Sequence, residues 1–330
     1  MTGPTRPTKI TASGIAPPTS RPSGSVAAPI PVTVNINTPN LVAPGSQPFQ
    51  AVRNAFETRS TWSTITFAPQ LGSFPESFPM EGTSLVTFKD TPANRSASAG
   101  FGAVTFFWFA VVDTDPVVVE SDIVFNPQFG HTTTGIGGFD IENLCSHEVD
   151  HFLSLEHSAV IGSTGYPNFD ALDRSKRSLA LDDVAGSEFL YPFPDFAART
   201  GTLSGTVKFN VSSPVFGAQV VALRQPTGET VSELSVTGGE WRIDGLPPGN
   251  YTVYAEPFDG PYFPGLIDDG IYSTPFNTVF AHTFAGGIAA PTVYSVTAGG
   301  TTSGIDLIVP ATVRVNATGF GLSPNGTTPV

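Results

Sequence analysis

The sequence is poor in cysteine, in basic residues and in long apolar runs. Cys145 is the only cysteine among 330 residues, so no internal disulfide framework can hold the fold. Lys and Arg number 15 against 28 Asp and Glu, and the resulting net charge of −13 excludes nucleic acid as a partner, because phosphate would be repelled. No apolar run approaches the roughly 18 residues of a membrane span, so we expect no transmembrane segment.

Glycine and proline are abundant instead. The chain holds 34 Gly and 31 Pro, which favours turn-rich β structure over general disorder. Residues 1–28 are rich in Pro, Thr and Ser and lack the apolar core of a secretory signal, so they predict a disordered leader. Residues 311–330 are interpreted as a tail or as the start of a truncated further domain.

Residues 29–195 alternate between strand and helix patterns typical of an α+β domain with a twisted mixed sheet and three helices. Strands are expected near Val32–Ile36 and at Ser63–Phe67, Ser84–Phe88, Ala103–Val112 and Val117–Phe125. Helices are expected over Gln47–Arg59, over Ile141–Leu153 with Asp140 as its N-cap, and over Leu179–Leu190.

From residue 199 to residue 310 the pattern changes to short alternating strands separated by Gly, Pro and Asn, which is typical of an all-β sandwich. Pro192–Arg199 is the expected joint between the two domains. The expected strands are Leu203–Phe209, Gln219–Leu223, Thr230–Val236, Trp241–Ile243 and Tyr251–Ala255, with further ones near Thr292–Val296 and Gly304–Val309.

Three of the five histidines lie in one short segment, Cys145–His157, which contains H-E-x-x-H and a third histidine six residues later. His147 and His151 are four residues apart and therefore share one face of a helix, where both imidazoles can bind one zinc ion. His157 can supply a third ligand if the helix breaks near Ser154 and the chain turns back.

Three protein nitrogens leave the fourth position of zinc open to water, as in catalytic rather than structural sites. Glu148 directly follows the first histidine, so it is the candidate general base that activates this water. Two other interpretations are a chance arrangement of histidines and a structural zinc site, which would more often recruit cysteine. The spacing thus predicts zinc-dependent peptide hydrolysis.

These residues resemble the metzincins, whose signature continues after H-E-x-x-H to a third histidine and a methionine turn. Among them the chain is most similar to the matrixins, over about Pro31 to Tyr191. The resemblance also includes Ser121–Phe125, Ser158 after the third histidine, Gly165-Tyr166-Pro167 where matrixins have Met-Tyr-Pro, and Leu181–Gly186 with Leu190-Tyr191 of the last helix.

Three positions depart from the matrixin pattern. Ser154 stands where the family has a glycine in a left-handed turn, so we expect some backbone strain. Asp150 replaces a common glycine and should need a hydrogen-bonding partner. Gly165 replaces the methionine beneath the zinc, which removes an apolar floor without removing a ligand.

The resemblance implies roles for four more residues. Tyr166 and Pro167 would line the pocket for the substrate side chain that follows the scissile bond. Asp182 and Asp183 would brace the last helix against the methionine turn. Cys145 precedes His147 by two residues, off the ligand face, and is interpreted as a small buried helix residue.

Calcium is a second possible cofactor, since matrixins often bind it. Asp113, Asp115, Glu120 and Asp122 could supply oxygen ligands, although an acidic turn in an acidic protein is usually only solvated. His131 and His282 are the only histidines outside the motif, so a second, histidine-rich zinc site is not expected.

The second domain resembles the carboxypeptidase regulatory-like, or prealbumin-like, β-sandwich through Gly205-Thr206-Val207 and Gly245–Val253. That module usually has no catalysis of its own. The sequence therefore predicts a secreted or cell-surface, monomeric zinc endopeptidase that cleaves internal bonds of protein or peptide substrates. The alternative is a catalytically silent protein that binds or adheres through its β-sandwich.

Overall fold

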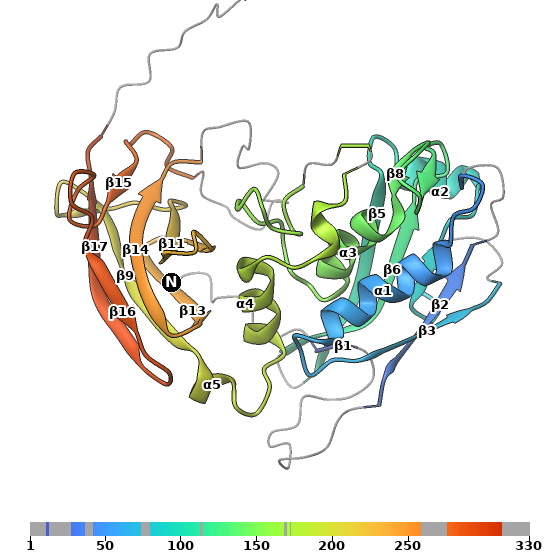
Figure 1. Cartoon of the computed structure of the whole chain (residues 1–330), viewed down its shortest axis with the longest axis horizontal. Helices are drawn as coiled ribbons and strands as arrows, with labels where there is room; N and C mark the ends of the chain where they lie inside the picture. The colour runs from blue at the N-terminus through green and yellow to red at the C-terminus, as the bar shows by residue number, and fades with distance from the viewer. Residues whose placement is uncertain are drawn as a thin grey trace, which may run out of the picture.

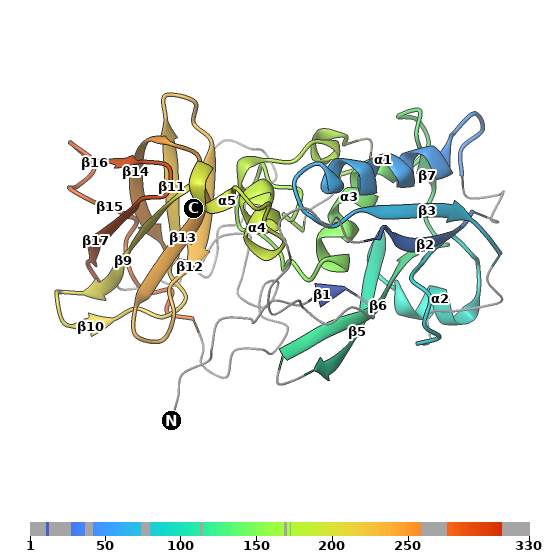
Figure 2. The ribbon, with the colours of Figure 1, turned by 90° about the horizontal axis from the view of Figure 1, so that it is seen from below.

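The computed structural model describes residues 11–12, 28–36, 42–73, 80–112, 115–167, 170–171, 173–258 and 276–311. They form two domains that lie side by side (Figures 1 and 2). The N-terminal domain comprises the elements from strand β1 to helix α4, and the β-sandwich runs from β9 to β17. Helix α4 lies between them in both views.

A six-stranded sheet forms one layer of the N-terminal domain. Its order is β1-β6-β4-β2-β3, and β5 pairs with β6. Strand β5 runs antiparallel to β6, whereas the other pairs are parallel. The strands are β1 (Thr11–Ala12), β2 (Ile30–Asn35), β3 (Phe67–Leu71), β4 (Leu85–Thr87), β5 (Ala103–Val112) and β6 (Asp115–Phe125).

Two long helices, α1 (Pro48–Ser60) and α3 (Ile141–Phe152), pack on this sheet and on each other. Proline at the first position of α1 fits because its missing N–H has no helical partner there. Phe56 of α1 and Phe152 of α3 meet edge to face with ring centroids 5.3 Å apart, and both are fully buried. Their contact fixes α3 above the sheet.

Helix α3 begins and ends at residues that the sequence identifies. Asp140 is its N-cap and accepts a hydrogen bond from Asn143 N at 3.0 Å, as expected. Arg177 forms an ion pair with the same carboxylate. The helix ends at Phe152, and Ser154 has φ of 62°, so the left-handed turn expected at this serine is confirmed.

The shorter elements complete the domain. Helix α2 (Pro92–Ala97) is capped by the Thr91 side chain, and α4 (Leu181–Leu190) agrees with the expected last helix. The others are β7 (His131–Thr132), β8 (Phe139–Asp140), the 3-10 turn η1 (Ser175–Arg177) and α5 (Phe196–Arg199).

Two sheets make up the β-sandwich. In one, β9 pairs with β10, β13 and β17; in the other, the order is β12-β11-β14-β15 and β16 pairs with β14. Trp241, Tyr251 and Leu203 lie in the core between them. The strands are β9 (Gly201–Phe209), β10 (Ser213–Pro214), β11 (Gln219–Gln225), β12 (Thr230–Leu234), β13 (Glu240–Leu246), β14 (Gly249–Glu256), β15 (Thr283–Phe284), β16 (Val293–Val296) and β17 (Thr301–Val309).

Some expected elements differ from the structure. The strand expected at Ser63–Phe67 is wrong by four residues, because β3 covers Phe67–Leu71 instead. Residues Thr11–Ala12 of the expected leader pair with β6, so they are not without structure. Helices α2 and α5 were not expected. Most of the leader and residues 312–330 of the tail lie outside the described residues.

A buried ion pair joins α1 to α3. Arg59 contacts the Asp150 carboxylate, and both side chains are at most 2% exposed. Arg59 Nη1 also donates to Ser187 Oγ at 2.6 Å and to Asp183 O at 3.2 Å, so α4 is tied to the same guanidinium. The Asp150 side chain, unusual beside a zinc motif, therefore has the polar partner that its burial requires.

Removing one member of this pair should destabilise the protein, because the other charge stays buried without a partner. We expect Arg59→Met to lower the free energy of unfolding by about 3–5 kcal/mol, and Arg59→Met/Asp150→Leu to recover most of that loss. Urea denaturation followed by circular dichroism would measure both. Arg53→Met is the matched control, since Arg53 makes an exposed pair with Glu57 on the same helix and should cost less than about 1 kcal/mol. Equal losses for the two single variants would contradict the assignment.

The left-handed residue at the end of α3 gives a second stability prediction. Ser154→Gly should raise the free energy of unfolding by about 0.5–1 kcal/mol, since relief of strain exceeds the added chain entropy. Ser154→Val should lower it by about 1–3 kcal/mol, because a β-branched residue fits poorly at positive φ. Thermal unfolding of the metal-free protein would test whether stability falls in the order Gly, Ser, Val at position 154. Any other order of stabilities would exclude backbone strain at this position.

Candidate metal centre

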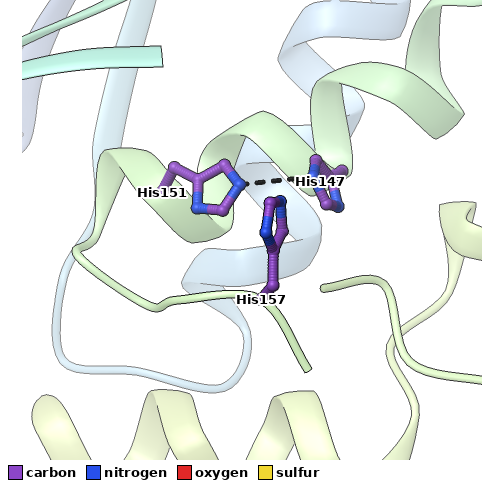
Figure 3. Close-up of side chains that lie close together, drawn as sticks. All are labelled: His147, His151 and His157. Carbon is purple, nitrogen blue, oxygen red and sulfur yellow. Dashed lines mark hydrogen bonds between the residues drawn. The ribbon is translucent and has the colours of Figure 1, made fainter. Parts of the chain in front are cut away.

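The three histidines of the motif converge on one point (Figure 3). His147 and His151 project from α3, and His157 comes from the extended segment after the bend. Their ligand atoms all lie within 4.8 Å of one another, and the Nε2 atoms of His147 and His151 are 3.2 Å apart. The structure thus brings together the residues whose spacing suggested a metal site.

Backbone carbonyls orient the two helical imidazoles. His147 Nδ1–H donates to Thr164 O at 2.8 Å, and His151 Nδ1–H donates to Leu155 O at 2.9 Å. In a neutral imidazole this assignment leaves Nε2 as an unprotonated acceptor. Both Nε2 lone pairs therefore point into the same small space, an arrangement that a bound cation stabilises.

The charge state of these rings also suits a metal ligand. Burial, together with the neighbouring His151 and His157, holds the pKa of His147 well below its usual value. Burial and His157 lower the pKa of His151 to about 4. Two nitrogens bound tetrahedrally at 2.0–2.1 Å from zinc lie about 3.3 Å apart, close to the separation observed here. The donor set and its spacing therefore fit zinc.

Glu148 lies next to the histidines on α3 and faces β5. Its side chain is 3% exposed, and Oε2 accepts a hydrogen bond from Thr105 Oγ1 at 2.7 Å. Burial raises the pKa of Glu148 to about 7, while the bond from Thr105 acts in the opposite direction. The carboxyl group is thus held in one orientation with a pKa near neutrality.

The turn after His157 is fastened by one carboxylate. Asp183 accepts hydrogen bonds from Ser163 Oγ, from Thr164 N at 2.8 Å and from Gly165 N at 3.2 Å. The expected brace between Asp183 and this turn is therefore present. Gly165 offers no side chain beneath the histidines, but the hydrogen bonds place the Thr164 carbonyl that orients His147.

The two expected pocket residues follow this turn. Tyr166 and Pro167 are half-buried, and Tyr166 O accepts a hydrogen bond from Lys176 Nζ. The same ammonium lies 5.6 Å from the centre of the Tyr166 ring. Lys176 is only 4% exposed, and burial lowers its pKa to about 8. Lys176 thus holds both the backbone carbonyl and the ring of Tyr166, the first of the two expected pocket residues.

Sequence reasoning missed Thr105, Lys176 and Arg59, which contact Glu148, Tyr166 and Asp150. Thr105 lies 43 residues from Glu148, and Arg59 is likewise far along the chain from Asp150, whereas Lys176 is 10 residues from Tyr166 across a loop. The buried Asp150 was the one available signal, because a carboxylate among apolar helix residues requires a cation. Cys145 is buried in the core as expected, and burial raises its pKa well above the usual value.

Two of the four acidic residues considered for calcium lie together in the part of the chain that the structure describes. Glu120 and Asp122 of β6 lie near Glu81, whereas Asp113 is outside the described residues. Backbone N–H groups already donate to two of these carboxylates, from Glu81 to Glu120 and from Leu85 to Asp122. Burial raises the pKa of Asp122 to about 8, so this carboxyl is readily protonated. Calcium binding here stays a prediction.

Within the described residues, no helix is long and apolar enough to cross a membrane. A comparison with curated proteins gave no match. Among solved structures, the Bacillus anthracis TIE protein matches at 13% identity over 34% of this chain and 17% of its own, with a TM-score of 0.22. The minor pilin of Streptococcus agalactiae matches at 12% identity over 37% of this chain and 48% of its own, with a TM-score of 0.21.

A third structure, a DUF3823 family protein from Parabacteroides merdae, matches at 13% identity over 34% of this chain and 47% of its own, with a TM-score of 0.21. The chain thus spans less than half of each of these proteins, and the likeness carries no functional argument. The family comparisons are more specific. Residues 202–258 match the carboxypeptidase regulatory-like domain, and residues 30–192 match the matrixin family. The chain therefore carries a matrixin domain, of a metallopeptidase family, followed by a carboxypeptidase regulatory-like domain.

Proposed function

We propose that this protein is a zinc-dependent endopeptidase that hydrolyses internal peptide bonds of extended protein substrates. The observation that carries the proposal is the convergence of three imidazoles, two with Nδ1 fixed by carbonyls, beside a buried glutamate. His147, His151 and His157 would hold the metal. When bound, zinc polarises the substrate carbonyl and lowers the pKa of the attacking water.

The residues of the chain move the proton in this scheme. Glu148 accepts a proton from the attacking water and passes it to the leaving amine. Thr105 holds the carboxyl group in place through its hydrogen bond to Oε2. A pKa of about 7 lets Glu148 act in both directions near neutral pH, because neither protonation state is strongly favoured.

Strand β5 supports an extended substrate. Among the described strands it pairs only with β6, so no other described strand lies along its second edge, where an extended peptide could add as a further strand. Thr105, the partner of Glu148, belongs to this same strand. A peptide added along β5 would therefore lie beside the histidines, and Tyr166 and Pro167 would contact the side chain after the cleaved bond. Action outside the cell, which the family implies, stays a prediction.

Replacing the proposed base should separate metal binding from chemistry. Glu148→Gln should keep zinc, since no ligand changes, and should reduce peptide cleavage by about 10²-fold or more. Metal analysis and a cleavage assay on a peptide library measure the two effects. Glu142→Gln on the same helix is the matched control and should cleave as the wild type does. A zinc-loaded wild type that cleaves nothing would favour the catalytically silent binding protein instead.

Removing the third histidine should weaken the metal site itself. We expect His157→Ala to bind zinc at least about tenfold more weakly, because one of three protein nitrogens is lost. Competition with a chromogenic chelator would measure the affinity. His282→Ala, in the β-sandwich, should leave it unchanged. Equal zinc affinities for His157→Ala and the wild type would remove His157 from the ligand set.

A further inference from the structure

One carboxylate, that of Asp182, links the β-sandwich to the segment that carries His157. Asp182, at the start of α4, accepts a hydrogen bond from Ser232 N of β12 at 2.8 Å through Oδ1. Its Oδ2 accepts from Ser158 Oγ. Ser158 directly follows His157, so Asp182 connects the second domain to the neighbour of the third histidine.

Helix α4 is packed into the sandwich as closely as a core element. Ala185 of α4 is 3% exposed and belongs to the hydrophobic core of the sandwich. A side chain at Gly245 of β13 would lie 3.3 Å from Ala185, so the two backbones approach closely at this point. The domains are therefore joined through a packed interface, which restricts their relative motion.

A second contact is apolar and independent of Asp182. Ala159, two residues after His157, packs against a cluster centred on Phe258 and Phe276. Phe216 and Leu234 of the second domain complete this cluster. The chain just beyond the third histidine is thus held by the sandwich on its apolar side as well.

The segment needs such support because it has left the helix. Ser158 N donates to Gly165 O at 3.0 Å, which fixes one side of the loop to the following turn. The other side is held by Asp182 and by the aromatic cluster. Groups that hold a ligand-bearing segment act on metal affinity much as the partners of the ligands do.

We propose that the β-sandwich positions the segment that carries His157 and so contributes to metal binding. It does so by packing against α4, where Asp182 is the positioning residue that links Ser232 to Ser158. The proposal rests on the proposed function where it concerns zinc. It assigns the second domain a task other than binding substrate or a surface. Metal affinity and the order of the His157 segment should then depend on residues of a domain that supplies no ligand.

Ser232→Pro tests the link from the side of the sandwich. Strand β12 pairs only with β11 among the described strands, and the Ser232 N–H points to Asp182, so proline removes this donor at an edge. Ser232→Ala keeps the N–H and is the matched control. Hydrogen exchange of peptides spanning residues 155–165 in the full-length, metal-free protein should be faster in Ser232→Pro and unchanged in Ser232→Ala.

Proline at position 232 could also disturb the sandwich itself, and faster hydrogen exchange in β13 and β14 would reveal that. Variants of Asp182 test the same link without changing a strand of the sandwich. Asp182→Ala removes both acceptors and should speed exchange over residues 155–165. Asp182→Asn can accept from Ser232 and donate to Ser158, so it should restore most of the protection. Unchanged exchange in Asp182→Ala would overturn the proposal.

Zinc affinity supplies the second measurement. Asp182→Ala and Ser232→Pro should bind zinc about tenfold more weakly than the wild type by chelator competition, and Asp182→Asn should not. Faster exchange with unchanged zinc affinity would overturn the positioning role. A wild type that binds no zinc would defeat the proposed function, while the exchange result would still decide whether the sandwich orders the segment.

Discussion

The bend after α3 is the constraint on which the site depends. Two histidines four residues apart lie on one face of a helix, but a third imidazole reaches them only if the helix stops and the chain reverses. Ser154 adopts the left-handed conformation at that point, and Leu155 then offers its carbonyl to His151. The same reversal that returns His157 therefore also orients one of the helical ligands.

Helix α4 connects the parts that must hold this bend. Its Asp183 fastens the turn whose Thr164 carbonyl orients His147, while its Asp182 contacts both Ser158 and the sandwich. Arg59 reaches α4 as well as Asp150 of α3. Buried polar groups that have several partners, as these three do, favour one arrangement of the helices. Any other arrangement would leave a buried donor or acceptor without a hydrogen bond, which costs free energy.

The sequence predicted what depends on local spacing. The shared helix face of His147 and His151 and the Asp140 cap follow from residue spacing and capping preference, whereas the left-handed Ser154 was expected from the resemblance to the matrixins. The position of β3 was wrong because its segment, Phe67–Leu71, contains a proline and shows no clear alternation. Helix α2 had a signal, Thr91 followed by Pro92, but it is too short to show a helical period.

The tertiary partners of the site residues could not be predicted in the same way. Thr105, Arg59 and Lys176 look like ordinary strand, helix and loop residues until the fold places them against Glu148, Asp150 and Tyr166. Likewise, nothing in the Ser232 sequence context indicates that its backbone N–H would meet Asp182. Tertiary packing, rather than any local motif, decides these contacts.

The most direct test of the account is an anomalous-scattering measurement at the zinc absorption edge on crystals of the full-length protein. The account predicts one zinc ion at 2.0–2.1 Å from a nitrogen of each of His147, His151 and His157. Crystals grown with zinc that show no ion between these rings, or an ion held without His157, would contradict it.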